Sequence, residues 1–449
     1  MNEVTRYDLP LKCSTAAVLR VARECTTEFT LIYTKPTDLE FIHFGLERLV
    51  QIARYTGAAM IYADHFNKEG ETVTQAPVID LQSGSLRDDF EFGGVQLYRT
   101  SALREAAAMM DVQYEYAGLY DLRLKVSRLG SIVHANEYLY YEVRTDTRAS
   151  GERLFDYVDP SNRAVQIEME KACTDHLKAV GGYLEPGKWQ EADIESGDFE
   201  FEASVVIPCR NRARTIADAL DSALRQKTDF KYNVIIVDDN STDGTVDIIR
   251  ETLASHPFRD RLVYIPQDAT YHAIGGNWNA ALHHPSCGRY ALQLDSDDVY
   301  NSPDTVQKFV DEFRRSRAAL VIGTYRITDI NLQELPPGVI AHKEWTPENG
   351  RNNALRINGL GAPRGFWTPL ARELNFPTTK YGEDYALALR ISRTHKVSRI
   401  WDVLYNCRRW QDNSDAALSV EAENANNLYK DRIRTWELQA RIRMNSEAD

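Results

Sequence analysis

Apolar and polar positions alternate in blocks from about residue 203 onward. Short apolar runs typical of buried strands are separated by longer segments in which apolar residues recur with helical spacing. The predicted strands cover 201–209, 232–240, 261–267 and 289–298, and the predicted helices cover 213–227, 242–256 and 275–285. This repeated strand–helix order predicts an α/β fold with a parallel sheet that carries helices on both faces.

Polar residues follow directly after three of these apolar runs. Pro208, Cys209, Arg210 and Asn211 close the first, Asp239 follows the second, and Asp295, Ser296 and Asp297 follow the last. Ligands of open α/β sheets bind outside the carboxyl ends of the strands. We therefore expect these side chains to converge on one site.

The composition shifts between residues 183 and 203, where the chain is acidic, holds Pro and Gly, and lacks clear periodicity. This shift predicts four parts. They are an N-terminal domain at 1–182, a linker at 183–203, a catalytic domain at 204–412 and a helical extension at 413–449.

The two halves of the chain resemble each other. Residues 116–144 match 381–409 at a constant offset of 265 positions, and 57–67 match 317–327 at an offset near 260. In the same alignment, residues 29–40 correspond to residues 290–301. A near-constant offset over more than about a hundred residues predicts an ancient duplication.

The first copy lacks the carboxylates of the second. Thr34-Lys35-Pro36 stands where Asp295-Ser296-Asp297 stands, and Gly118-Leu119 stands where Glu383-Asp384 stands. The first copy also has no room for the two opening strand–helix units. We therefore interpret it as a degenerate, non-catalytic domain and place the chemistry in the second half.

An Asp-x-Asp at a strand end suits a hard divalent cation, Mg²⁺ or Mn²⁺, which binds one or two carboxylates together with substrate phosphates. A solvated turn or a helix N-cap would also explain the tripeptide by itself. The sequence favours the cation because Asp295, Asp297 and Asp298 end a strongly apolar run. Burying three like charges there without a cation would be costly.

Bulk composition excludes some classes of protein. The 449 residues carry a formal net charge of −13, with 66 acidic and 53 basic residues, which disfavours a free-standing nucleic-acid binder. No run of about 18 apolar residues predicts a membrane-spanning helix, and residues 1–12 lack the apolar core of a signal peptide. The six scattered cysteines favour reduced thiols in a cytoplasmic protein.

The order and spacing of four motifs are specific, although each motif is weak alone. The motifs are SVVIPCRNR, VIIVDDNSTDGT, NWNAALHHPSCGRYALQLDSDD and YGEDYALALR. Together, over residues 203–412, they resemble the family 2 glycosyltransferases with the GT-A fold. The resemblance implies a GT-A catalytic domain, so that the N-terminal half would be a truncated, degenerate GT-A-like domain. It further implies an inverting hexosyltransferase of polysaccharide biosynthesis.

The resemblance also implies roles for individual residues. Pro208 to Asn211 would line the nucleotide base, Asp239 would hold the base or ribose, and Asn279 aligns with a family asparagine. Asp295 and Ser296 would face the ribose side, and Asp297 would ligate the Mg²⁺ or Mn²⁺ ion with Asp295 beside it. Asp384, next to Glu383, would be the general base on the acceptor hydroxyl. Helix capping is the plain alternative for Asp239 and for Glu383-Asp384.

Other positions fit the family less well. Arg364 and Trp367 lie where the family's acceptor loop runs, and Trp367 would serve equally well as a core residue. Arg408, Arg409 and Trp410 would offer donors to the diphosphate and a plane for a sugar, although Arg409 has a counterpart, Arg144, in the first copy. The segment GGNWNAAL lacks an arginine that many family members carry, which leaves recognition of the nucleobase open.

The predicted donor is a nucleotide-diphosphate sugar, and family habit favours UDP over GDP. The acceptor would be a hydroxyl of a glycan or a lipid-linked glycan. The basic amphipathic segment 425–444 would either touch an anionic membrane surface or pack its Leu-Ile-Trp stripe on the domain with arginines outward. We also consider a homodimer.

Two other functions remain open from sequence alone. One is a non-catalytic glycan- or nucleotide-binding scaffold, disfavoured because the second copy keeps every carboxylate that the first has lost. The other is a sugar nucleotidyltransferase, which usually has a Gly-rich phosphate loop after the first strand. The segment CRNRART contains no glycine.

Overall fold

The computed structural model describes residues 3–447 except 145, 147, 149–155, 157–158, 269–271, 411–412 and 414–416. The chain divides into two compact units. The first unit comprises Met1–Tyr183, Leu355–Ile357 and Ser414–Asp449, and the second comprises Leu184–Ala354 and Asn358–Asn413.

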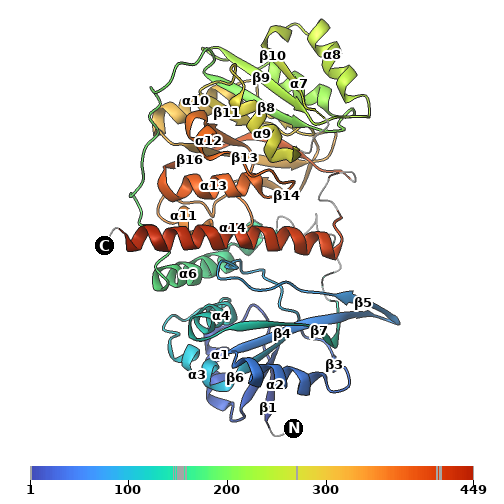
Figure 1. The fold of residues 1–449 in the computed structure, drawn as a ribbon, viewed down its shortest axis with the longest axis vertical. Helices are drawn as coiled ribbons and strands as arrows, with labels where there is room; N and C mark the ends of the chain where they lie inside the picture. Colours follow the sequence, from blue (N-terminus) through green and yellow to red (C-terminus); the bar gives the residue numbers. More distant parts are fainter. Residues whose placement is uncertain are drawn as a thin grey trace. The chain divides into compact units, whose positions relative to one another are not determined.

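The second unit holds a nine-stranded sheet in the order β10-β9-β8-β11-β15-β13-β16-β12, with β14 paired to β13 (Figure 1). Strands β10, β9, β8 and β11 are parallel, β15 is antiparallel to β11 and β13, and β13 is parallel to β16. The strands are β8 (Ala203–Cys209), β9 (Tyr232–Asp238), β10 (Leu262–Pro266), β11 (Tyr290–Gln293), β12 (Val299–Tyr300), β13 (Leu320–Thr328), β14 (Glu334–Ile340), β15 (Arg364–Trp367) and β16 (Val397–Arg408).

Every strand and helix that the pattern predicts between 201 and 298 is confirmed, with ends that differ by a few residues. The helices of this unit are α7 (Ile216–Leu224), α8 (Thr245–Ser255), α9 (Ala273–His283), α10 (Thr305–Ser316), α11 (Gly350–Asn353), α12 (Thr368–Leu374) and α13 (Glu383–Thr394), with a 3-10 turn η3 (Arg259–Arg261).

Strand alternation assigns the two faces of this sheet. Tyr290 on β11 stacks on Phe313 of α10 at a ring distance of 4.3 Å. On the other face, Phe366 of β15 packs edge-on against Trp278 of α9, with ring centres 5.7 Å apart. Arg364, two residues before Phe366, shares the α9 face. This placement matters for the site described below.

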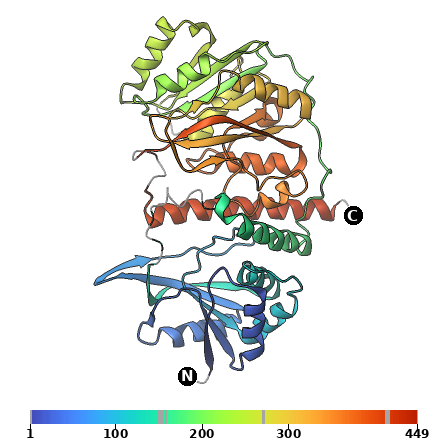
Figure 2. The same cartoon turned by 180° about the vertical axis from the view of Figure 1, so that it is seen from behind.

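The first unit holds a seven-stranded sheet in the order β1-β2-β6-β4-β7-β3, with β5 paired to β4. Figure 2 draws the strands of this unit in blue and teal. Its strands are β1 (Val4–Asp8), β2 (Phe29–Tyr33), β3 (Leu39–Phe41), β4 (Met60–Glu69), β5 (Thr72–Ala76), β6 (Val95–Arg99) and β7 (Ile132–Val143). Its helices are α1 (Thr15–Glu24), α2 (Gly45–Thr56), α3 (Thr100–Ala108), α4 (Gly118–Leu129), α6 (Arg163–Ala179) and α14 (Val420–Ser446), with η2 (Pro160–Asn162). Separate apolar cores form around α2 and around α1, α3 and α4.

The two sheets share strand order and strand direction over seven strands. β1, β2, β6, β4, β7, β3 and β5 take the places of β8, β11, β15, β13, β16, β12 and β14. Helix α2 and strand β4 start 260 residues before α10 and β13, whereas α4 and β7 start 265 residues before α13 and β16. The first unit has no equivalents of β9 and β10 among its described strands. The duplication itself stays a prediction.

Two features outside the sheets differ from the expectations. Residues 184–203 belong to the second unit rather than to a free linker: Ala192 is fully buried and its N–H donates to the carbonyl of Arg317. In α14 the outward placement of the arginines, one of the two alternatives, holds for Arg432 and Arg443 but is wrong for two others. Arg434 and Arg441 are fully buried and paired with Asp431 and Glu437, while Trp436 is 58% exposed. Charge pairing within the helix overrides the simple amphipathic pattern.

Candidate active site

The turn after β11 holds the three aspartates predicted from the sequence. The N–H of Asp295 donates to the Tyr405 hydroxyl at 3.0 Å, and Nε2 of Gln293 lies 3.1 Å from both carboxylate oxygens of Asp295. Burial, and then the charge of Asp297, raise the pKa of Asp295. The site thus favours any partner that brings positive charge to this carboxylate.

Asp298 and Asp297 play different parts in this turn. Asp298 is buried, its Oδ1 accepts the N–H of Arg408 at 2.7 Å, and burial raises its pKa well above the usual value. Asp297 Oδ2 lies 3.6 Å from Nε of Arg212 and 3.5 Å from Nδ2 of Asn413. Asp298 therefore ties the turn to β16, while the side chain of Asp297 is 17% exposed.

These residues fit a divalent cation only in part. No group of three or more His, Cys, Asp or Glu side chains in the described part of the chain is arranged to hold a metal ion by itself. Asp295 and Asp297 would supply one or two oxygen ligands, which is the usual protein share for Mg²⁺ bound with substrate phosphates. The raised pKa of Asp295 adds a reason for a cation to bind there.

The loops after β8 and β9 lie side by side. The N–H of Asp239 donates to the Cys209 carbonyl at 2.8 Å, and Asn211 exchanges hydrogen bonds with the 241–242 segment through its N–H and its Oδ1. Asn211 has a left-handed φ of 52°. Arg210 Nη1 lies 3.8 Å from Oδ2 of Asp239. The two loops thus form one rim, as the sequence predicts.

The remaining two residues of the predicted base-binding stretch lie inside β8. Pro208 and Cys209 are buried in that strand and pair in register with Val237 and Asp238 of β9. Burial raises the pKa of the Cys209 thiol to about 12, so this thiol stays protonated and is not a nucleophile.

Glu383 and Asp384 begin α13, after Gly382 in a left-handed conformation with φ of 78°. Glu383 is buried, and burial together with the charge of Asp384 raises its pKa to about 8. The side chain of Asp384 is 29% exposed, its Oδ1 accepts the N–H of Tyr385 at 2.6 Å, and its Oδ2 lies 2.5 Å from Nη2 of Arg364. The two neighbouring carboxylates therefore differ in environment.

One buried arginine joins the two acidic clusters. Arg364 donates from Nη1 to Oε1 of Gln293 at 2.9 Å, and Gln293 in turn donates to Asp295. The chain of contacts from Asp384 through Arg364 and Gln293 to Asp295 has no gap longer than 3.1 Å. It brings the start of α13 to the carboxyl end of β11.

Asn279 does not reach this site. Its Nδ2 donates to the carbonyl of Phe376 at 2.9 Å, and its Oδ1 accepts the N–H of Phe376 at 2.8 Å. Both polar atoms of the amide are engaged in holding α9 to the 376 segment. The predicted contact to the nucleotide is therefore corrected to a structural role.

The sequence left two places open for Trp367, the acceptor loop and the core, and the register of β15 speaks against the first. β15 runs antiparallel to β11, with Trp367 opposite Tyr290 and Gly365 opposite Leu292. Trp367 therefore lies at the amino end of β11, away from the aspartate turn. It lines a separate cavity of about 410 Å³ together with Gln190, Glu373 and His395.

Different groups surround each of the three residues Arg408, Arg409 and Trp410. Arg408 is buried, with Nε donating to the Asp297 carbonyl at 2.5 Å and Nη1 to Asp218 at 2.8 Å. The N–H of Arg409 donates to the Thr328 carbonyl at 2.7 Å. Arg214 lies over the Trp410 ring at 5.1 Å. Arg408 therefore supports the aspartate turn from behind, which corrects its predicted role as a diphosphate ligand.

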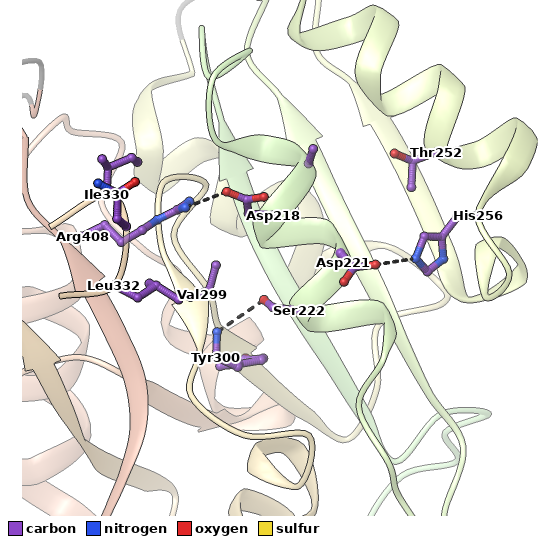
Figure 3. A pocket seen from close by; sticks show the side chains of 12 residues that line it. Asp218, Asp221, Ser222, Thr252, His256, Val299, Tyr300, Ile330, Leu332 and Arg408 are labelled. Atoms are coloured by element: carbon purple, nitrogen blue, oxygen red, sulfur yellow. Dashed lines mark hydrogen bonds and ion pairs between the residues drawn. The ribbon is translucent and has the colours of Figure 1, made fainter. Parts of the chain in front are cut away.

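A cavity of about 720 Å³ lies on the far side of Arg408 (Figure 3). Asp218, Asp221 and Ser222 of α7 line it together with His256 and Tyr300. The figure shows Asp221 paired with His256, and Oδ1 of Asp221 lies 3.1 Å from Nε2 of His256. None of Asp239, Asp295 and Asp297 is among its lining residues. These three aspartates therefore belong to a site separate from this cavity.

Sequence reasoning missed several residues of the site. Arg212, Gln293, Tyr405 and Asn413 all contact the aspartate turn. Gln293 is the last residue of β11 and carried a signal, because a buried polar residue at the end of an apolar run usually has a partner. Tyr405 and Asn413 come from distant segments and carried none.

The second unit thus holds an aspartate turn, a loop rim and the acidic start of α13 near the carboxyl ends of its parallel strands β8, β9 and β11. Residues 204–368 match the family model described as glycosyl transferase family 2. The predicted resemblance to this family is thus confirmed for these residues, which lie within the second unit, and the α/β fold of that unit agrees with it.

The chain is similar to several known enzymes. It is 39% identical over 122 residues to a chondroitin synthase of Escherichia coli, which covers 27% of this chain and 16% of that one. It is 24% identical over 240 residues to the E. coli UDP-Glc:α-D-GlcNAc-diphosphoundecaprenol β-1,3-glucosyltransferase WfgD, covering 53% of this chain and 85% of that one. A crystal structure of S. aureus TarS 1–349 with UDP matches 53% of this chain and 65% of that one, with 21% identity and a TM-score of 0.40. The chain thus spans a small part of the chondroitin synthase.

No helix in the described residues is long and apolar enough to cross a membrane.

Proposed function

We propose that the chain is an inverting, metal-dependent glycosyltransferase. It would move a sugar from a UDP-linked donor to a hydroxyl of a glycan or lipid-linked acceptor. The observation that carries this proposal is the continuous chain of contacts from Asp384 to Asp295, which brings a carboxylate base beside the aspartate turn.

The donor would bind along the carboxyl ends of β8, β9 and β11. Asp239 and the Asn211 rim would hold the nucleoside, and Asp295 would face the ribose side. Asp297 would bind the Mg²⁺ or Mn²⁺ ion with Asp295 beside it, and the ion would supply Lewis-acid stabilisation of charge on the departing diphosphate. The raised pKa of Asp295 supports this use.

Asp384 is the better base of the acidic pair. Its side chain is 29% exposed, whereas Glu383 is buried and its pKa is raised to about 8. In an inverting transfer the acceptor oxygen attacks the anomeric carbon opposite the leaving diphosphate. One carboxylate takes the hydroxyl proton, which is general base catalysis. No covalent sugar–enzyme intermediate is needed, so one base suffices.

UDP is favoured over GDP because WfgD, which aligns over half of this chain, is named for a UDP-glucose donor and a lipid-linked acceptor. The first unit would be non-catalytic, since Lys35 and Glu142 form a buried ion pair there and Glu142 is fully enclosed. It would serve for docking or acceptor binding.

Thermal unfolding with a panel of nucleotide sugars and Mn²⁺ tests the proposal, because a specific ligand stabilises the folded state in proportion to its occupancy. We expect a UDP-sugar with Mn²⁺ to raise the melting temperature of the wild type and not of Asp297→Ala. Asp247→Asn, an exposed aspartate on α8, is the matched control.

Product analysis separates the competing functions. A glycosyltransferase releases a nucleoside diphosphate, whereas a nucleotidyltransferase releases pyrophosphate. Binding without turnover, unchanged in Asp384→Asn, would favour a scaffold and contradict the proposal.

A further inference from the structure

Arg364 is enclosed among carboxylates and carbonyls rather than facing open solvent. It is 7% exposed and lies at the first position of β15, on the sheet face that α9 covers. Each of its three guanidine nitrogens has a partner: Nε donates to the Leu360 carbonyl at 2.8 Å, Nη1 to Gln293 at 2.9 Å and Nη2 to Asp384 at 2.5 Å. Such a planar fork holds its partners in fixed directions.

The partners of this guanidinium belong to the proposed base and to the proposed donor site. Gln293 uses its carbonyl oxygen toward Arg364 and its amide nitrogen toward both oxygens of Asp295. Asp384 uses Oδ2 toward Arg364 and Oδ1 toward the N–H of Tyr385. The orientation of Asp384 is thus set from two sides, and one of those sides leads to the donor site.

We propose that Arg364 is a positioning residue that fixes the base Asp384 relative to the donor-binding Asp295 through Gln293. The inference rests on the proposed function of this site and reassigns Arg364 from an acceptor or diphosphate ligand. A group already engaged at three nitrogens and nearly enclosed would act on the reaction by geometry, not by contact with substrate.

The test compares Arg364→Gln and Arg364→Lys with a control, Arg372→Gln. Arg372 also donates to main-chain carbonyls of the second unit, those of Leu282 at 2.6 Å and His284 at 3.4 Å, but takes no part in the aspartate network. For each variant we would measure kcat, KM for donor and acceptor, and the rise in melting temperature with UDP and Mn²⁺.

We expect Arg364→Gln to lower kcat about 10²-fold, because a displacement of about 1 Å can cost that much. The stabilisation by UDP and Mn²⁺ should stay near that of the wild type. The kcat of Arg364→Lys should fall between that of the wild type and that of Arg364→Gln, since one ammonium can reach Asp384 but cannot hold all three partners. The Arg372→Gln control should keep wild-type kcat.

A double variant makes the claim sharper. If Arg364 acts through Asp384, adding Arg364→Gln to Asp384→Asn should slow the residual turnover by no more than about threefold. Gln293→Met breaks the link on its other side and should lower kcat by about tenfold, which keeps the inference testable if Arg364→Gln fails to fold.

Different results overturn different claims. Loss of the UDP and Mn²⁺ stabilisation in Arg364→Gln, in step with kcat, would make Arg364 a direct phosphate ligand and overturn the inference. So would wild-type kcat in Arg364→Gln, or full multiplication of the two defects in the double variant. A wild-type chain that turns over no nucleotide sugar would overturn the proposed function itself.

Discussion

The turn after β2 and the turn after β11 occupy the same place in two sheets with the same strand order. After β11 stand Asp295, Ser296 and Asp297, and after β2 stand Thr34, Lys35 and Pro36. Likewise α13 begins with Glu383 and Asp384 where α4 begins with Gly118 and Leu119. Seven strands are common to both units, whereas the side chains at these two positions differ and the first unit lacks equivalents of β9 and β10 among its described strands. Fold alone therefore does not assign function within this chain.

The first unit neutralises its own charge at this edge. Lys35 pairs with Glu142, which also lies 2.9 Å from Nε2 of His65 and accepts the N–H of Gly94 at 2.9 Å. Burial raises the pKa of Glu142, but the contacts from His65 and Lys35 outweigh burial, and the pKa ends below its usual value. A lysine here competes with any cation for the carboxylate, so the comparison predicts metal binding in the second unit alone.

The largest expected effect is on the base. Asp384→Asn keeps the shape of the side chain but cannot accept the proton, and we expect kcat to fall about 10²–10⁴-fold. Release of nucleoside diphosphate measures it, with Asp247→Asn as the control. Turnover within about twofold of the wild type would remove Asp384 from the chemistry.

The next effect is on the stability of the first unit. Lys35→Met removes one charged partner of the buried Glu142 and leaves His65 as the other, and we expect the free energy of unfolding to fall by about 1.5–3 kcal/mol. Urea unfolding measures this loss, and Lys35→Met with Glu142→Gln should recover part of it. Turnover per folded molecule should stay unchanged. If Lys35→Met lost turnover without losing stability, the first unit would take part in catalysis, which would contradict the account.

A smaller effect concerns pH and Glu383. Its pKa of about 8 in the folded chain lies above the ordinary 4.5, so the folded state holds a proton that the unfolded chain has released. The free energy of unfolding should therefore fall as pH rises from about 4.5 to 8, by at most about 1.4 kcal/mol per pH unit from this group. Glu383→Gln should flatten that part of the stability–pH curve. An identical slope in both proteins would contradict the assignment.

The smallest effect on function belongs to Asn279. Asn279→Ala leaves the N–H and carbonyl of Phe376 without their partner, which should cost about 1–3 kcal/mol of stability. KM for the donor should remain within about twofold of the wild type, because the amide does not face the nucleotide. A KM that rises about tenfold or more would restore the sequence-based assignment.

Local patterns predicted the parts of the site that follow strands. The apolar runs before Asp239 and Asp295 predicted where both strands end. Because the carboxyl ends of parallel strands meet at one edge of a sheet, these runs also predicted that the two residues lie on that edge. The helix start at Glu383 was equally visible. These signals depend only on neighbours in sequence.

Partners across the sheet carried no such signal. Whether Arg364 or Trp367 reaches the site depends on the direction of β15, and its antiparallel register puts Arg364 at the aspartate end and Trp367 at the other. Asn279 likewise fits the family position yet meets Phe376. The buried arginines of α14 show the same limit, since an alternation of charges does not reveal which charges pair.

Crystals soaked with Mn²⁺ and UDP test the central claim most directly, through the anomalous signal of the manganese. The account predicts one strong peak beside Asp297 and Asp295 with the diphosphate against it, and none near Lys35 and Glu142. A peak at the Lys35 edge, or UDP bound away from the turn after β11, would contradict it.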